Sequence, residues 1–93
     1  MSYLFFETYF NTIFRRLYPR PIDSLEDQIL AYSHLIQLHQ QVLQVLRQQP
    51  DQPFPNAQAV ILNKITELRG SLATVFRERL DQSCQDFYDQ KST

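Results

Sequence analysis

The five prolines of this 93-residue chain lie in two short stretches, residues 19–21 and 50–55, and leave three long segments free of proline. Proline lacks a backbone N–H and ends helices, so both stretches are typical of linkers. The chain has a single glycine, Gly70, whereas β-hairpin turns and phosphate-binding loops usually need several glycines. Together these features predict helical segments and argue against a β-sheet or a nucleotide-binding loop.

The first segment alternates pairs of apolar and polar residues from residue 5 to residue 18, a spacing that forms one apolar helix face. We expect a helix over about residues 3–18, with a mostly aromatic face. The rings could form the core of the protein, dock a partner, or lie in a membrane surface, although a membrane-bound helix would usually carry more lysines beside them. The candidate partner-binding surface consists of Phe5, Phe6, Tyr9, Phe10 and Phe14.

The second segment predicts a helix over about residues 24–49. Ser24 and Asp27 form a capping-box pattern at its start, and Asp23 with Glu26 offers an alternative register. Its apolar residues follow two adjacent stripes, and a helix with so wide an apolar arc needs neighbours on two sides. We therefore expect this helix to be central. The first stripe has heptad spacing and comprises Leu25, Ile29, Tyr32, Ile36, His39, Leu43 and Leu46; the second comprises Ala31, Leu35, Leu38, Val42 and Val45.

The third segment predicts a helix over about residues 56–90, with Asn56 as its N-cap. Gly70 could end this helix and let Ser71 begin another, but the apolar spacing continues through it, which favours one continuous helix. At ~1.5 Å per residue that helix would be ~50 Å long, against ~37 Å and ~24 Å for the other two. A helix of this length would extend past the others and expose apolar residues.

These features predict an all-α protein with one helical domain over residues 1–93, because a chain of this length allows only one domain. The expected arrangement is an antiparallel up-down-up three-helix bundle with a long C-terminal helix, or a four-helix one if Gly70 breaks that helix. A homodimer would cover the excess of the long helix along a candidate oligomer seam of Leu72, Phe76, Leu80 and Phe87. In an up-down-up bundle the C-terminal ends of the first and third helices lie at the same end. This predicts ion pairs between basic residues of the first helix, Arg15, Arg16 and Arg20, and acidic residues of the third, Asp81, Asp86 and Asp89.

No catalytic residue, metal site or cofactor site is expected. His34 and His39 are five residues apart, which separates them by about 140° around a helix and prevents them from sharing a metal ion. His39 lies on an apolar stripe, so we expect a core or interface histidine with a polar neighbour. Cys84, the only cysteine, also lies on an apolar stripe, which favours a small core residue over a nucleophile.

The net charge of −1 and the absence of a basic block make nucleic acid an improbable partner. Charged residues make up only 20% of the chain, which favours association with itself or another protein. We therefore expect a non-enzymatic interaction module: an oligomerising adaptor, regulator or assembly factor. The alternative is a peripheral membrane protein that binds lipid through residues 3–18. No signal peptide or membrane-spanning run is apparent, so the expected location is the cytoplasm.

Overall fold

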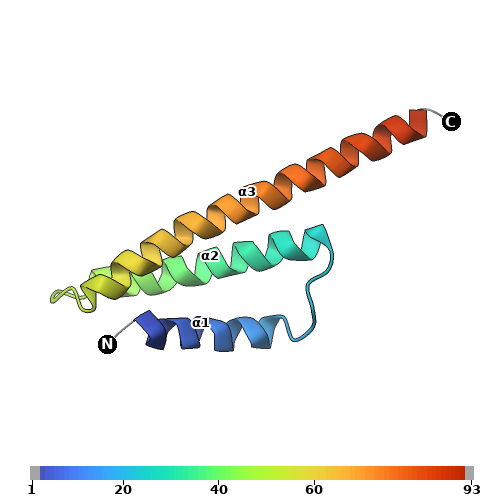
Figure 1. The fold of residues 1–93 in the computed structure, drawn as a ribbon. Helices are drawn as coiled ribbons and strands as arrows, with labels where there is room; N and C mark the ends of the chain where they lie inside the picture. Colours follow the sequence, from blue (N-terminus) through green and yellow to red (C-terminus); the bar gives the residue numbers. More distant parts are fainter. Residues whose placement is uncertain (1–2, 92–93) are drawn as a thin grey trace.

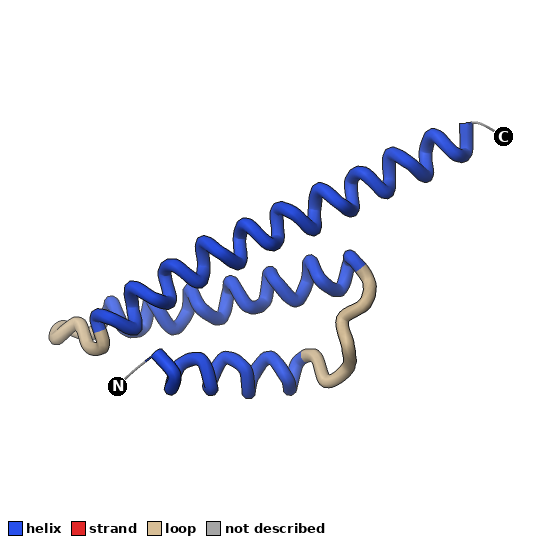
Figure 2. Tube along the Cα trace, viewed as in Figure 1, coloured by secondary structure: helices blue, strands red, loops and turns tan. Residues whose placement is uncertain are grey.

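The computed structural model describes residues 3–91, which form three α-helices (Figure 1). The helices are α1 (Tyr3–Leu17), α2 (Leu25–Gln48) and α3 (Pro55–Lys91). Figure 2 shows that only the two connections between them are irregular. No strand occurs within residues 3–91, so the prediction of an all-α protein is confirmed.

Helix α3 continues through Gly70 without a break, so the four-helix alternative is wrong. Gly70 does not have a positive φ, and a Cβ atom added to it would meet nothing within 4 Å. Glycine in a helix costs about 1 kcal/mol relative to alanine. The buried residues Ile65, Leu68 and Val75 on either side of Gly70 continue one apolar line, and their packing outweighs this cost.

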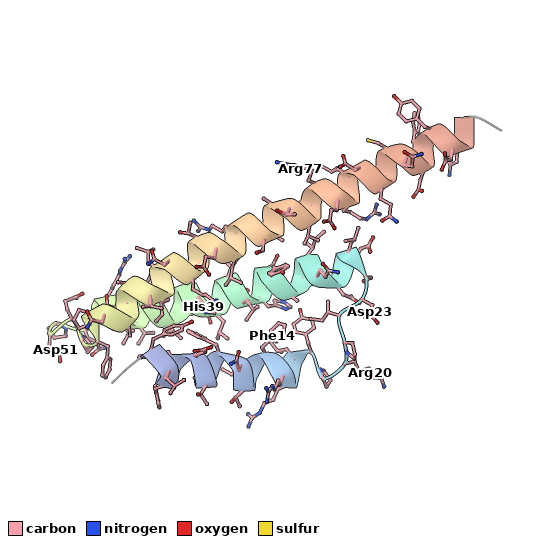
Figure 3. All side chains as sticks on the ribbon, viewed as in Figure 1. Phe14, Arg20, Asp23, His39, Asp51 and Arg77 are labelled. Atoms are coloured by element: carbon pink, nitrogen blue, oxygen red, sulfur yellow. The ribbon has the colours of Figure 1, made fainter. Side chains whose placement is uncertain are left out.

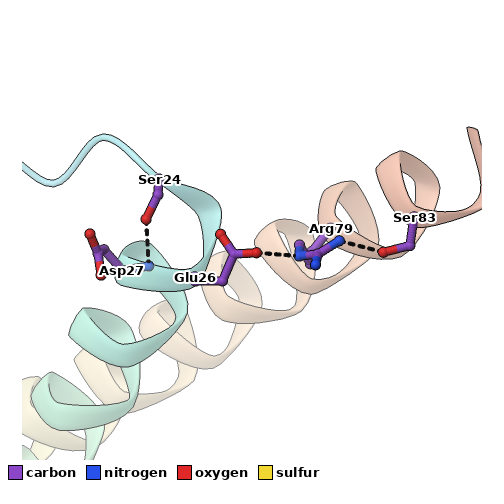
Figure 4. A network of polar contacts seen from close by, with 5 residues as sticks. All are labelled: Ser24, Glu26, Asp27, Arg79 and Ser83. Atoms are coloured by element: carbon purple, nitrogen blue, oxygen red, sulfur yellow. Dashed lines mark hydrogen bonds and ion pairs between the residues drawn. The ribbon is translucent and has the colours of Figure 1, made fainter. Parts of the chain in front are cut away.

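Helix α2 starts with the predicted cap. Ser24 has an extended backbone, and its side-chain oxygen accepts a hydrogen bond of 3.0 Å from the backbone N–H of Asp27 (Figure 4). This bond satisfies one of the N–H groups that the first helical turn leaves without a partner. The register that begins at Ser24 is therefore the one the chain adopts.

The start of α3 differs from the prediction, because Asn56 lies inside the helix. Pro55 is the first helical residue, where its missing N–H costs nothing. The first helical hydrogen bond runs from the N–H of Gln58 to the carbonyl of Phe54, at 2.9 Å. Phe54 has a φ of 54°, and its ring packs edge-on against Phe6 of α1, with 5.7 Å between the ring centroids.

Most of the core lies between α2 and α3, and α1 adds two phenylalanines to it. Figure 1 shows α2 turning back beside α1, and α3 turning back beside α2. Phe6 near the start of α1 contacts the loop that follows α2, and Phe10 stacks on His39 in the middle of α2. The core cluster consists of Phe6, Phe10, Ile36, Leu43, Leu46, Ala57, Ile61, Ile65 and Leu68.

Helix α3 extends past the start of α2 (Figure 1). Its buried line ends at Val75, and the next residue on that line, Arg79, binds Glu26 in the first turn of α2, with 2.6 Å between Nε and the carboxylate oxygen. All residues from 80 to 90 are exposed. We call residues 80–91 the α3 overhang; it is about 18 Å long, at ~1.5 Å per residue. The described chain therefore measures 64 × 24 × 17 Å.

The predicted ion pairs between the ends of α1 and α3 do not form. The two ion pairs between described residues are Arg79–Glu26 and Lys64–Glu67. Arg79 meets the start of α2, so the acidic residues that follow it lie on the overhang, away from the arginines of α1. The ion pairs do not form because the part of α3 that extends past the other helices is its C-terminal end, the end that carries these acidic residues.

Candidate interaction surfaces

The predicted aromatic surface of α1 divides into a buried half and an exposed half. Phe6 and Phe10 are buried in the core of the chain, and Phe14 is half-buried and packs on Tyr18, with 5.0 Å between the ring centroids. Phe5 and Tyr9 keep 55% and 46% of their surface exposed. Because α1 presents Phe6 and Phe10 to α2 and α3, only Phe5 and Tyr9 of this surface keep about half of their area accessible to a partner.

Phe5 and Tyr9 form one side of a groove between α1 and α2, with a volume of about 460 Å³. The other side comes from the outer edge of the wide apolar arc of α2. Apart from Gln41, the lining is apolar or aromatic. We call this the α1–α2 groove; it is lined by Phe5, Phe6, Tyr9, Leu38, Gln41, Val42, Val45 and Leu46.

The α2 side of this groove was not identified from the sequence, which indicated only that the wide apolar arc of α2 needs neighbours on two sides. Val45 belongs to that arc, yet it is more than half exposed. Leu4, on the first turn of α1, is also exposed and extends the apolar surface around Phe5. The signal that could have revealed the groove is the width of the apolar arc of α2, because Val45 lies about 120° around the helix from His39, where α1 makes contact.

The predicted oligomer seam also divides into two parts. Leu72 is half-buried and packs against the core. Phe76, Leu80 and Phe87 keep 47%, 63% and 54% of their surface exposed. We call these three residues the overhang seam. Phe87 lies edge-on to Tyr88, with 6.2 Å between the ring centroids, so the end of the seam is aromatic.

The overhang seam is not a continuation of the core line of α3. At ~100° per residue, its three residues fall within about 40° of one another, and the line that faces α2 lies beside them. That line turns polar at Arg79 and continues through Asp86. The overhang therefore presents a polar line in the direction of α2 and an apolar line on the neighbouring side.

Cys84 is exposed on the overhang, so the prediction of a core cysteine is wrong. It lies between Leu80 and Phe87 in sequence, and the helix there extends past the start of α2. The apolar stripe on which the prediction relied is real, but no helix within residues 3–91 covers this part of it. His39 lies in the middle of α2, so Cys84 and His39 do not form a nucleophile–base pair.

His39 is a core histidine, as its position on the apolar stripe indicated. It is 3% exposed, its Nδ1 donates a hydrogen bond of 2.7 Å to the carbonyl of Leu35, and its ring stacks on Phe10 with 3.8 Å between centroids. Burial lowers its pKa, the bond to Leu35 opposes this change, and the positive charge of Lys64 adds to the lowering. The imidazole is therefore neutral near pH 7.

The remaining polar groups show no convergence on a reaction centre. Figure 3 shows His39 and Phe14 between α1 and α2, whereas Arg77 points outward from α3. His34 is exposed and hydrogen-bonds the hydroxyl of Tyr18. Within residues 3–91, no three His, Cys, Asp or Glu side chains are grouped closely enough to hold a metal ion. The α1–α2 groove and the overhang seam are the candidate interaction surfaces.

No protein-family model matches this chain, and no curated protein or solved structure matches it. Among the described helices, none is long and apolar enough to cross a lipid bilayer.

Proposed function

We propose that this protein is a non-enzymatic helical interaction module of the cytoplasm, which self-associates and acts as an adaptor, regulator or assembly factor. In this proposal residues 1–93 are one domain, an antiparallel up-down-up bundle of three helices, and the α3 overhang pairs with a second copy. The observation that carries the proposal is the overhang seam. Large apolar side chains that stay exposed side by side on a helix are typical of interaction sites.

The composition of the surface supports association. Soluble proteins resist association through dense surface charge, and only 20% of this chain is charged. The overhang seam places Phe76 and Leu80 in water at about half or more of their surface. Aromatic residues are enriched at protein interfaces because each buries a large area at a small entropic cost. A partner on the seam would remove this apolar area from water.

We expect the purified chain to dimerise in the micromolar range, and the substitution Leu80→Glu to raise the dissociation constant at least about tenfold by placing a charge in the seam. Sedimentation velocity over a concentration series measures both. Leu17→Glu is the matched control, since Leu17 at the end of α1 is 56% exposed, against 63% for Leu80. A wild-type chain that stays monomeric to about 100 μM would contradict self-association, and equal effects of the two substitutions would contradict the overhang seam as its site.

The second candidate function is binding to a membrane surface through α1. It is supported by the side-by-side exposure of Leu4, Phe5 and Tyr9 on the first two turns of α1. Such residues can insert into the boundary between headgroups and acyl chains. Co-sedimentation with neutral and anionic vesicles distinguishes the two candidates. We expect the protein to stay in the supernatant with both, and binding that Phe5→Glu abolishes would favour the membrane function.

A further inference from the structure

We infer that two copies of this chain pair through their α3 overhangs in antiparallel orientation, around a two-fold axis near residue 82. This inference rests on the proposed self-association and specifies its geometry. In this arrangement Leu80 of each copy lies opposite Cys84 of the other, and Phe76 of each lies opposite the aromatic end of the other overhang. The spacing of the apolar residues and the positions of the charges both lead to this arrangement.

The apolar residues of the overhang are arranged almost symmetrically about residue 82. Phe76, Leu80, Cys84 and Phe87 follow one another at intervals of four, four and three residues. Reversing the direction of this series gives nearly the same series. A two-fold interface is self-complementary, because the same patch of each copy contacts the other. An antiparallel helix pair therefore places apolar residues of one copy against apolar residues of the other over the middle of the overlap, residues 76–88.

The charges beside the seam distinguish the two possible orientations. Arg79 and Asp86 are seven residues, or about two turns, apart and lie on the same edge of the seam. In an antiparallel pair centred near residue 82, Arg79 of each copy lies beside Asp86 of the other, which gives two attractive pairs. In a parallel pair, the edge that carries Arg79 and Asp86 lies on opposite sides of the interface in the two copies, so neither of these attractive pairs can form. Charges at the edges of helix pairs set orientation in this way.

Arg79 can serve the interface while it holds its own chain together. Its Nε donates to Glu26, and its Nη1 donates to Ser83 (Figure 4). The guanidinium has five N–H groups, so these two bonds leave donors available for the Asp86 carboxylate of a second copy. Its contacts with α2 and with its own helix also hold the side chain in place, which reduces the entropy lost when the second copy binds.

The overlap is short, and this determines the expected strength. With the axis near residue 82, residues 73–91 of the two copies run side by side over about 28 Å. Stable interfaces bury about 1,200–2,000 Å² in total, and a single pair of short helices falls at the low end of this range. The expected dimer is therefore a reversible one, with a dissociation constant in the micromolar range.

Small-angle X-ray scattering of the full wild-type chain tests the orientation. One chain is 64 Å long, so two chains that share about 28 Å of overlap should give a maximum dimension of about 100 Å. A parallel pair would keep a length close to that of one chain. A dimer by sedimentation whose maximum dimension stays near 64 Å overturns the antiparallel orientation alone. The absence of any dimer overturns the proposed function as well.

Charge reversal tests the register. We expect Asp86→Arg to weaken the dimer about tenfold, because it places like charges together at both of the symmetry-related 79–86 contacts. Arg79→Asp should do the same, and the double variant Arg79→Asp/Asp86→Arg should restore the dimer. Asp89→Arg is the matched control, since Asp89 lies about 200° from Phe87 around the helix and faces away from the seam. Glu26→Gln removes the charge of the intramolecular partner of Arg79 but keeps an oxygen that can accept from its Nε, so it should weaken the dimer much less than Asp86→Arg does.

Sedimentation velocity of all five variants gives the dissociation constants that test the Arg79–Asp86 contact. Failure of the double variant to recover the wild-type dissociation constant overturns the Arg79–Asp86 contact, as do equal effects of Asp86→Arg and Asp89→Arg. Circular dichroism of each variant checks that the helices remain folded. Unfolding could weaken the dimer, but it could not restore the wild-type dissociation constant in the double variant.

Discussion

His39 shows how one polar side chain can belong to an apolar core. Two features make its burial tolerable: Nδ1 donates to the carbonyl of Leu35, and the flat ring packs against Phe10. A neutral imidazole is acceptable there, but an imidazolium would have to lose its hydration within the core and near Lys64. The contact between α1 and α2 therefore depends on the protonation state of His39.

This dependence predicts that the free energy of unfolding falls as the pH drops below about 6.5, the ordinary pKa of histidine. The folded pKa of His39 lies below the unfolded value, so the unfolded chain binds the proton first and acid favours unfolding. At pH 5.5 the loss of unfolding free energy is at most about 1.4 kcal/mol, because this pH lies only one unit below the pKa of a histidine in the unfolded chain. Urea denaturation at pH 7.5 and 5.5 measures it.

The control for this prediction is the exposed histidine. His34→Gln should lose stability between the two pH values as the wild type does, whereas His39→Leu should lose less. The pKa of Glu26 is lowered below 4.5, first by a hydrogen bond from the backbone N–H of Glu26 and then by the side chain of Arg79. That carboxylate therefore titrates below the range from pH 5.5 to 7.5. Parallel losses in the wild type and in His39→Leu would show that His39 does not determine the acid sensitivity.

Among the helices, α3 depends most on contacts with another helix, α2, for its stability. Its first half packs on α2, and its last twelve residues, the overhang, extend past it. Isolated helices shorter than about 12–15 residues are marginal in water. The continuity of the overhang with a packed half, and the Arg79 contacts at the junction, therefore stabilise it. Gly70, in the packed half, is the weakest helix former in α3 apart from its first residue.

Gly70→Ala should therefore raise the free energy of unfolding by about 0.4–1 kcal/mol. The helical backbone at Gly70 accepts an L-residue, and the added methyl group meets no atom within 4 Å, so the gain comes from reduced flexibility of the unfolded chain. Chemical denaturation with an unchanged m-value is the measurement. Ala73→Gly, at another exposed position of the same helix, should lower stability by a similar amount. A loss of stability in Gly70→Ala would mean that this position bends or contacts another chain.

Local sequence patterns predicted the helices but not which helix faces are covered by other helices. Proline positions, apolar spacing and the Ser24 cap depend on neighbours in sequence, so all three helices and the continuity through Gly70 could be predicted. Exposure depends on the relative lengths and positions of the helices. For this reason Cys84, which was predicted to be a core residue, is exposed, and Val45 is exposed although it lies on an apolar stripe. The two halves of the aromatic face of α1 could not be distinguished for the same reason.

The whole molecule combines a packed body with a helix that leaves it. Its long axis of 64 Å is more than twice either of the other two, because α3 alone continues beyond the body. A chain this short buries a small share of its surface, so its stability is modest and differs along its length. The body and the α3 overhang should therefore behave differently when the chain is free and when it is paired.

Hydrogen exchange over a concentration series tests this difference. In dilute solution we expect the amides of residues 80–90 to exchange much faster than those of residues 57–75, because exposed helix ends open locally at a low free-energy cost. Pairing of two copies should slow exchange in the overhang as the concentration rises through the dissociation constant, and leave the body unchanged. Leu80→Glu should remove the concentration dependence while the amides of residues 57–75 keep their protection. Overhang amides with the same protection at every concentration in both proteins would show that the overhang is stable without a second copy, and that its exposed apolar side chains do not pair.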